Sequence, residues 1–375
     1  MRITGGSVFT GEGFEKRDVV VEGERFIENS STTCVQDDEP VIDATDCYVI
    51  PGLVDIHFHG SAGADMSDGD VEGLHKMGAY EASRGITAMC PATMTLPQEV
   101  LLKAALAAKA YIPAENEAAL VGINMEGPYI SPGKVGAQNP EYVRNPYIEE
   151  FKALQEASGG LFKLVDIAPE EPNADVFIET LADDVRISVA HTTTNYDTAE
   201  AAFAKGARHM THLYNAMPGL HHREPGPIPA AVEHPEVTAE IIADGVHIHP
   251  AMVRLAFKLF GDDRMILVSD TLRAAGLGDG VYDLGGQDVT VKGPVATIEA
   301  GNLAGSVSDL MRCLTVAVKD MDIPLVSAVK ASTINPARAI GLEDRGVIAP
   351  GYVADAVVLD QDLSIKAVVV RGVAL

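Results

Sequence analysis

The sequence predicts an α/β fold, a (β/α)8 TIM-like barrel joined to a small β-sandwich domain that both termini form. Short apolar runs alternate with longer helical patterns between residues 51 and 345, as in βα units around a parallel sheet. Both ends of the chain carry short β-type runs without helical periodicity. A length of 375 residues and a hydrophobic content of 47% suffice to bury a large core.

The small domain is predicted to combine residues 1–50 with residues 346–375. Val and Ile cluster or alternate in its short runs, which Gly, Asp and Glu separate. These runs are Asp18–Val21, Tyr48–Ile50, Asp355–Leu359 and Ile365–Arg371. Because the termini of a domain often lie close together, we expect the runs from the two ends to pair in one β-sandwich.

The barrel is predicted over residues 51–345. The eight apolar runs of strand length are Leu53–Phe58, Ile86–Cys90, Leu120–Met125, Phe162–Ile167, Arg186–Ala190, Ala207–Thr211, Thr238–Ala243 and Met265–Ser269. Helical patterns between them include Pro97–Tyr111, Ile148–Ala157, Tyr196–Lys205 and Pro250–Phe260. Residues 276–301, rich in Gly and Val, predict a β-hairpin insertion after the eighth run. A barrel of this kind carries its chemistry at the C-terminal ends of its strands.

Residues with metal-binding side chains follow several predicted strands. The first run leads into Asp55, His57 and His59, which the period-2 geometry of a strand places on one face. The third, fifth, sixth and eighth runs are followed by Glu126, His191, His212 and Asp270. Imidazole and carboxylate ligands suit Zn²⁺ or Fe²⁺, and a catalytic site keeps an open position where water becomes a nucleophile. Any one of these histidines could be an ordinary solvated residue, but their coincidence at strand ends predicts a catalytic metal site.

Composition excludes several classes of partner and compartment. Lys and Arg total 28 against 54 Asp and Glu, which gives a formal charge of −26 and opposes binding to nucleic acid or an anionic membrane. No secretory leader pattern or long apolar stretch is found, so we expect a cytoplasmic protein. The cysteines have no metal-site spacing and are expected to be inert; they are Cys34, Cys47, Cys90 and Cys313.

A family resemblance rests on longer motifs. The strand Pro51–Gly60 with its H-x-H pair, the single histidines after the fifth and sixth runs, and the aspartate after the eighth resemble the amidohydrolase superfamily. Within it, five blocks resemble the N-acetylglucosamine-6-phosphate deacetylase family. They span nearly the whole chain and are Met125–Pro128, Thr211–Met217, Arg223–Gly226, Asp244–His247 and Leu303–Ser306.

The resemblance implies a reaction and a metal centre. The expected reaction is hydrolysis of the acetamide of N-acetyl-D-glucosamine-6-phosphate to D-glucosamine-6-phosphate and acetate, in amino-sugar catabolism and cell-wall recycling. One or two divalent ions, Zn or Fe, are implied in each subunit. Glu126, His191 and His212 would bind the principal ion, while the H-x-H pair would hold a second ion that Glu126 bridges. Asp270 would act as general base and then as general acid.

The resemblance also implies the substrate contacts. Nine residues are expected to bind the sugar phosphate or to line the acetyl pocket. They are Ala137, Gln138, Asn215, Ala216, Arg223, His247, Leu303, Ala304 and Gly305. In the family the loop arginine can reach the neighbouring subunit's site, so a homodimer is implied. Some relatives have histidine in place of Gln138, which can hydrogen-bond but cannot carry charge. His221 and His222 are expected to face solvent, with His222 a minor candidate for substrate contact.

Two alternatives remain open on the sequence. The same metal chemistry could serve another N-acyl substrate, such as N-acetylgalactosamine-6-phosphate or an N-acyl-amino acid, because substrate choice lies in the loops. A non-catalytic barrel scaffold is a remote alternative, because competent residues occupy every ligand position and position 270.

Overall fold

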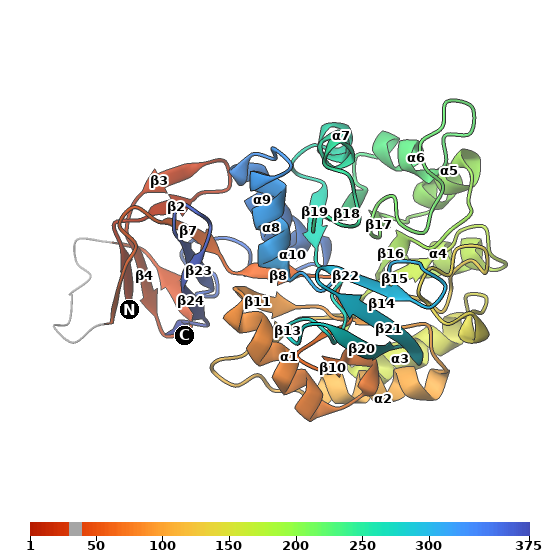
Figure 1. Ribbon diagram of the computed structural model, residues 1–375, viewed down its shortest axis with the longest axis horizontal. Helices are drawn as coiled ribbons and strands as arrows, with labels where there is room; N and C mark the ends of the chain where they lie inside the picture. The colour runs from red at the N-terminus through yellow and green to blue at the C-terminus, as the bar shows by residue number, and fades with distance from the viewer. Residues whose placement is uncertain (30–39) are drawn as a thin grey trace.

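The computed structural model describes residues 1–29 and 40–375, so Cys34 lies outside the described residues. At its centre, parallel strands form a three-stranded and a seven-stranded sheet, and in each sheet the strands follow one another in chain order (Figure 1). The strands are β8 (Leu53–Asp55), β11 (Ile86–Met89), β12 (Ala92–Thr93), β13 (Ala119–Leu120), β14 (Ile123–Met125), β15 (Phe162–Ile167), β16 (Arg186–Val189), β17 (His209–Met210), β18 (Thr238–Ile242) and β19 (Met265–Val268). Backbone hydrogen bonds also join the segments after β19 and β8, from Asp270 N to His57 O at 2.9 Å and from His59 N to Thr271 O at 2.7 Å.

The α/β class is confirmed, and each predicted run contains a strand. The third run is interrupted at Val121 and Gly122, between β13 and β14. Helices cover the sheet (Figure 1); they are α1 (Val71–Ser83), α2 (Gln98–Ala110), α3 (Ile148–Ser158), α4 (Ala174–Leu181), α5 (Tyr196–Ala204), α6 (Pro227–Glu233), α7 (Pro250–Phe260), α8 (Leu310–Lys319), α9 (Leu325–Ser332) and α10 (Ile334–Ala339). Buried aromatic rings hold helices to the sheet, because Phe151 of α3 packs on Phe162 of β15 and on Phe177 of α4.

The insertion after β19 differs from the predicted hairpin. It is a three-stranded antiparallel sheet of β20 (Gly280–Leu284), β21 (Gln287–Lys292) and β22 (Val295–Ile298). The additional strand arises at Gly293, whose φ of 55° lets the chain reverse a second time. Leu284 and Val289 face inward and pack with Met94 and Leu272, so this sheet covers the segment that follows β12.

Strands from both ends of the chain form two further sheets. One contains β1 (Arg2–Thr4), β4 (Val19–Glu22), β5 (Arg25–Ile27) and β6 (Val41–Asp43). The other contains β2 (Ser7–Phe9), β3 (Phe14–Lys16), β7 (Tyr48–Pro51), β23 (Ala356–Leu359), β24 (Ile365–Val370) and β25 (Val373–Ala374). Val49 of β7 pairs with Val358 of β23, and Ile3 and Phe26 of the first sheet belong to the same buried cluster as these valines. Figure 1 marks both termini at this end of the molecule.

Short elements complete the described chain: β9 (Gly60–Ser61), β10 (Ala64–Asp65), and the 3-10 helices η1 (Met66–Asp68) and η2 (Pro140–Tyr142). Among the described residues, none of the helices combines the length and the apolar character needed to cross a membrane.

Candidate metal centre and active site

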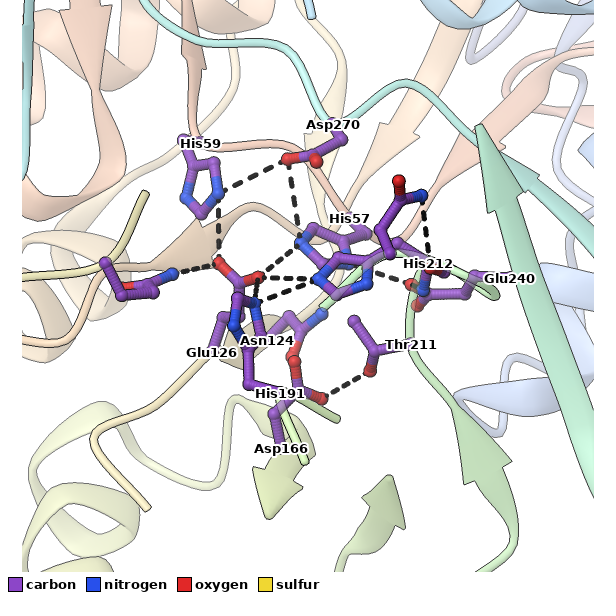
Figure 2. A network of polar contacts seen from close by, with 12 residues as sticks. His57, His59, Asn124, Glu126, Asp166, His191, Thr211, His212, Glu240 and Asp270 are labelled. Atoms are coloured by element: carbon purple, nitrogen blue, oxygen red, sulfur yellow. Dashed lines mark hydrogen bonds and ion pairs between the residues drawn. The ribbon is translucent and has the colours of Figure 1, made fainter. Parts of the chain in front are cut away.

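Six side chains with metal-binding atoms converge beyond the carboxyl ends of the parallel strands (Figure 2). They come from segments far apart in sequence, and each is buried. His57 and His59 follow β8, and the other members, which follow β14, β16, β17 and β19, are Glu126, His191, His212 and Asp270. The topology of the parallel sheet brings them together, because the carboxyl ends of its strands meet at one edge.

The first group consists of Glu126, His191 and His212. Glu126 Oε1 lies 2.9 Å from His191 Nε2 and 3.1 Å from His212 Nε2. The two imidazole nitrogens are 3.0 Å apart. Two nitrogens and one oxygen that face one another in this way form a ligand set suited to a divalent transition metal.

The second group consists of His57, His59 and Asp270. His59 Nε2 lies 3.3 Å from Asp270 Oδ1 and 3.0 Å from Glu126 Oε2, while His57 Nε2 lies 3.8 Å from Asp270 Oδ1. Glu126 therefore contacts histidines of both groups, as a bridging ligand would, with Oε2 near His59 and Oε1 also 3.6 Å from His57 Nε2. The structure also places Asp270 among possible ligands, beside its expected role in proton transfer.

The chain adopts unusual backbone geometry at these ligands. His191, His212 and Asp270 have φ values of 42°, 27° and 49°, in the region that residues other than glycine rarely occupy. Such a conformation costs about 1–3 kcal/mol for each residue and persists only where the surroundings impose it. The turn out of each strand aims its side chain at the common site.

The donor atoms and their surroundings fit a divalent cation. Within the described chain, His57 Nε2 and Asp270 Oδ1 are buried without a hydrogen-bond partner, although both face the site. Burial disfavours the imidazolium of His59, but the carboxylates of Glu126 and Asp270 outweigh it and raise the pKa of His59 to about 10. These carboxylates thus favour positive charge at this point. A metal ion would supply that charge and displace the proton, because histidine binds metals in its neutral form.

Glu240, which was not predicted from the sequence, contacts one histidine of each group. It lies in β18 and is fully buried, with Oε2 2.8 Å from His57 Nδ1 and 3.1 Å from the backbone nitrogen of His212. Its other oxygen lies 3.0 Å from His209 Nε2. Burial alone would raise the pKa of Glu240, but His57 and His209 lower it below its usual value. The sequence signal that could have identified Glu240 is a charged residue inside the apolar run Thr238–Ala243.

Asp55 does not join the site, which corrects one expectation. β8 ends at Asp55, so the period-2 geometry that would align Asp55 with His57 and His59 does not continue. Asp55 Oδ1 instead accepts a hydrogen bond from the backbone nitrogen of His57 at 3.2 Å.

A cavity of about 460 Å³ opens beside the two groups. Its wall includes several of the expected substrate contacts: Ala137, Gln138, Asn215, Ala216, His247, Leu303 and Gly305. Met94, Lys134, Leu284 and Asn302 also line it, although the sequence analysis did not select them. Ala304 does not line this cavity, since it is buried with Leu272 in the core of the insertion.

Arg223 lies outside this cavity, on an exposed loop. Its guanidinium Nη1 is 2.7 Å from His222 Nε2. Both residues are exposed, and so is His221. Arg223 instead lines a separate surface depression with Thr193 and Pro218.

His247 and Gly305 have defined supports at the cavity wall. His247 Nδ1 lies 2.8 Å from Asp244 Oδ2, which leaves Nε2 free to face a ligand. Burial lowers the pKa of His247, but the hydrogen bond and charge of Asp244 outweigh this effect and raise it. Gly305 has a φ of 65°, and a Cβ there would lie 2.9 Å from the carbonyl oxygen of Asp270. Only glycine lets this segment pack so closely against the site.

The chain and its fold match a known class of protein. The model of the amidohydrolase family matches residues 48–375, and the chain belongs to that family. Among its relatives, the N-acetylglucosamine-6-phosphate deacetylase of Bacillus subtilis (strain 168) is 38% identical over 333 residues, covering 87% of this chain and 84% of that protein. The N-acetylgalactosamine-6-phosphate deacetylase of Escherichia coli O157:H7 is 33% identical over 326 residues, with 86% of each chain covered.

A solved structure supports the same relationship. The crystal structure of N-acetyl-D-glucosamine-6-phosphate deacetylase from Mycobacterium smegmatis superposes with a TM-score of 0.92 at 32% sequence identity, over 100% of both chains. The family resemblance predicted from the motifs is thereby confirmed.

Proposed function

We propose that the protein hydrolyses the acetamide of N-acetyl-D-glucosamine-6-phosphate to D-glucosamine-6-phosphate and acetate. The observation that carries this proposal is the pair of facing ligand groups beside a cavity of about 460 Å³, with Asp270 at their junction. Several relatives bear the name of this activity. The step belongs to the breakdown of amino sugars, including those recovered from cell walls.

The proposed mechanism assigns one role to each group. Glu126, His191 and His212 would hold the principal divalent cation, which when bound supplies a Lewis acid for the amide carbonyl and for water. Asp270 takes a proton from the attacking water while a C–O bond forms at the carbonyl carbon. It then delivers that proton to the amine nitrogen as the C–N bond breaks, because an unprotonated amine is a poor leaving group. Acetate and the amino sugar phosphate result.

The ion is proposed to be Zn²⁺ or Fe²⁺, with one or two ions in each subunit. Nitrogen and carboxylate ligands suit both metals. The contact of Glu126 Oε2 with His59 at 3.0 Å supports a second ion held by His57 and His59.

Substrate binding is proposed to use both this chain and a second copy. His247, Asn215 and the Ala216 backbone would contact the sugar phosphate from within the cavity. Arg223 is exposed outside the cavity of its own chain, and we propose that it reaches the site of a partner subunit in a homodimer. A planar guanidinium can grip a phosphate at two points, which would offset the repulsion from a chain of charge −26.

We also propose a domain arrangement and a cellular compartment for the protein. The parallel strands would form one (β/α)8 barrel, while residues 1–50 and 346–375 would form a separate β-sandwich domain, as the shared core of their two sheets suggests. The free thiols of Cys47, Cys90 and Cys313 favour the cytoplasm.

A second candidate is deacetylation of N-acetylgalactosamine-6-phosphate, because a relative with that name is 33% identical. Acetate release should be compared for the two phosphorylated epimers and for unphosphorylated N-acetylglucosamine. We expect kcat/KM to be highest for N-acetylglucosamine-6-phosphate. A higher value for the galactosamine epimer would select the second candidate, and equal values with and without phosphate would contradict a phosphate site.

A further inference from the structure

We propose that Gln138 is a positioning residue for Glu126, in addition to lining the substrate cavity. Its side chain is buried, with 3% of its surface exposed. Gln138 Oε1 accepts a hydrogen bond from the backbone nitrogen of Thr95 at 2.7 Å, and Nε2 donates to Glu126 Oε2 at 2.6 Å. The amide thus spans the distance between the segment after β12 and the carboxylate after β14.

The first of these bonds fixes the direction of the second. The backbone nitrogen of Thr95 can only donate, so the amide oxygen of Gln138 must face it and the amide nitrogen must face Glu126. The segment that carries Gln138 is itself held in place, because Gln287 Nε2 donates to the carbonyl oxygen of Ala137 at 2.5 Å. Gln138 therefore presents Glu126 with a donor of fixed position.

This donor selects the orientation of the Glu126 carboxylate. Oε1 is left facing His191 and His212, while Oε2 lies between Gln138 and His59. If the carboxylate rotated, the hydrogen bond would be lost and a buried amide donor would be left unsatisfied, which is unfavourable. Gln138 thereby keeps Oε2 beside His59 and leaves Oε1 facing the other histidines of the site, which are His57, His191 and His212.

Partners that orient metal ligands in this way contribute to metal retention, and losing one typically costs about 10–100-fold in metal affinity. The inference rests on the proposed metal centre. Metal retention, measured separately from turnover, is the property that Gln138 should control.

The test compares Gln138→Met with Gln287→Met in the metal-loaded enzyme. The first removes the donor to Glu126, and the second removes only the tether on the neighbouring residue. The ion is withdrawn with increasing chelator, bound metal is quantified, and KM for the phosphorylated substrate is measured on reloaded enzyme. We expect Gln138→Met to bind metal about 10–100-fold more weakly. Gln287→Met should lose much less affinity, because the hydrogen bonds of Gln138 to Thr95 and Glu126 remain. Gln138→Asn, one methylene too short to make both contacts, should behave like Gln138→Met and replaces it if that variant does not fold.

Three outcomes separate the explanations. Unchanged metal affinity together with a raised KM in the Gln138 variants would reduce Gln138 to a substrate contact and overturn the inference. Equal metal loss in the Gln138 and Gln287 variants would also overturn it, because placement of the segment would then be the cause. A wild-type protein that binds no divalent metal would refute the proposed metal centre itself.

Discussion

Glu126 and Asp270 occupy adjoining positions with different tasks. Glu126 contacts histidines of both groups, and Asp270 Oδ1 lies 3.3 Å from His59 Nε2 on the cavity side. Burial raises the pKa of Asp270, but the close contact with His59 and the charge of His57 outweigh it and lower the pKa. Asp270 is therefore ionised and ready to accept a proton, whereas Glu126 is committed to ligand contacts.

Asp270→Asn separates proton transfer from metal binding. The amide keeps the size of the side chain but cannot take a proton from water, so kcat should fall by about 10²–10⁴-fold. The ion at Glu126, His191 and His212 should remain, which metal quantification beside steady-state kinetics would check. Substantial turnover in this variant would remove Asp270 from its role in proton transfer.

Glu240→Gln tests the support beneath the histidines. Glu240 contacts His57 Nδ1 and so directs His57 Nε2 toward the site. A glutamine there is neutral and can also donate a hydrogen bond, so it would hold the imidazole in this orientation less firmly. We expect affinity for an ion at His57 and His59 to fall by about 10–100-fold, measured as metal bound per subunit during chelator titration. Glu236→Gln, at a half-exposed glutamate outside the site, is the matched control. Identical titrations of both variants would show that Glu240 does not support the ion.

The residues of the candidate metal site could be predicted from the sequence, whereas the residues that support them could not. Side chains with metal-binding atoms lie at the ends of five of the eight predicted runs, and finding them requires only the positions of those runs in the sequence. The contact of Glu240 with His57 joins positions 183 residues apart, and it depends on which side of β18 the carboxylate occupies. The same holds for Gln138, whose loop position gave no sign that Glu126 would be its partner.

At the scale of secondary structure, most predicted strands extend too far at their C-terminal ends. β16 stops at Val189, β17 at Met210 and β19 at Val268, each one residue before the predicted end. The reason is that His191, His212 and Asp270 take positive φ values to reach the site, so the chain leaves the strand before them. An apolar pattern indicates which residues are buried. The last residues of these runs are buried but no longer belong to a strand, so the pattern placed the strand ends too late.

Helix α1 carries a buried carboxyl group, Glu81, near Asp55 at the end of β8. Glu81 is 2% exposed, and burial together with the neighbouring Asp55 carboxylate raises the pKa of Glu81 well above its usual value. The folded protein therefore holds a proton that the unfolded chain releases above about pH 4.5. The stability from this group is complete below that pH and is lost as the pH rises toward the folded pKa.

Glu81→Gln should remove this pH dependence, because the amide resembles the protonated acid. Between pH 5 and pH 8, roughly the range in which the unfolded carboxyl is ionised, the free energy of unfolding should decline less steeply in the variant than in the wild type. Denaturant titrations of both metal-loaded proteins across this range would measure the difference. Parallel pH profiles would show that Glu81 is already ionised in the folded state.

At the scale of the whole molecule, charge and assembly are linked. The formal charge of −26 repels a sugar phosphate at long range, so binding needs cationic groups close to the ligand. Arg223 lies outside its own cavity, and a second copy of the chain is the proposed source of that cation. The sequence motif indicated the arginine, but only the structure places it outside the cavity of its own subunit.

Mixed dimers test this arrangement. Arg223→Ala should raise KM for phosphorylated substrate with little effect on the unphosphorylated sugar. When Asp270→Asn and Arg223→Ala subunits are unfolded, mixed and refolded together, one site in each mixed dimer regains both Asp270 and a partner's Arg223. Activity at low substrate should then exceed the sum of the two separate variants. No gain from mixing, despite mixed dimers shown by mass, would place Arg223 in its own subunit's site or outside catalysis.

We propose that metal held by Glu126, His191 and His212 drives deacetylation of a phosphorylated amino sugar. The most direct test of this proposal is acetate release from N-acetylglucosamine-6-phosphate by enzyme as purified, after chelation, and after return of Zn²⁺ or Fe²⁺, with bound metal quantified each time. We expect release to disappear with the metal and to return in proportion to the metal bound. Undiminished release by metal-free enzyme, or none by the metal-loaded enzyme, would contradict the account.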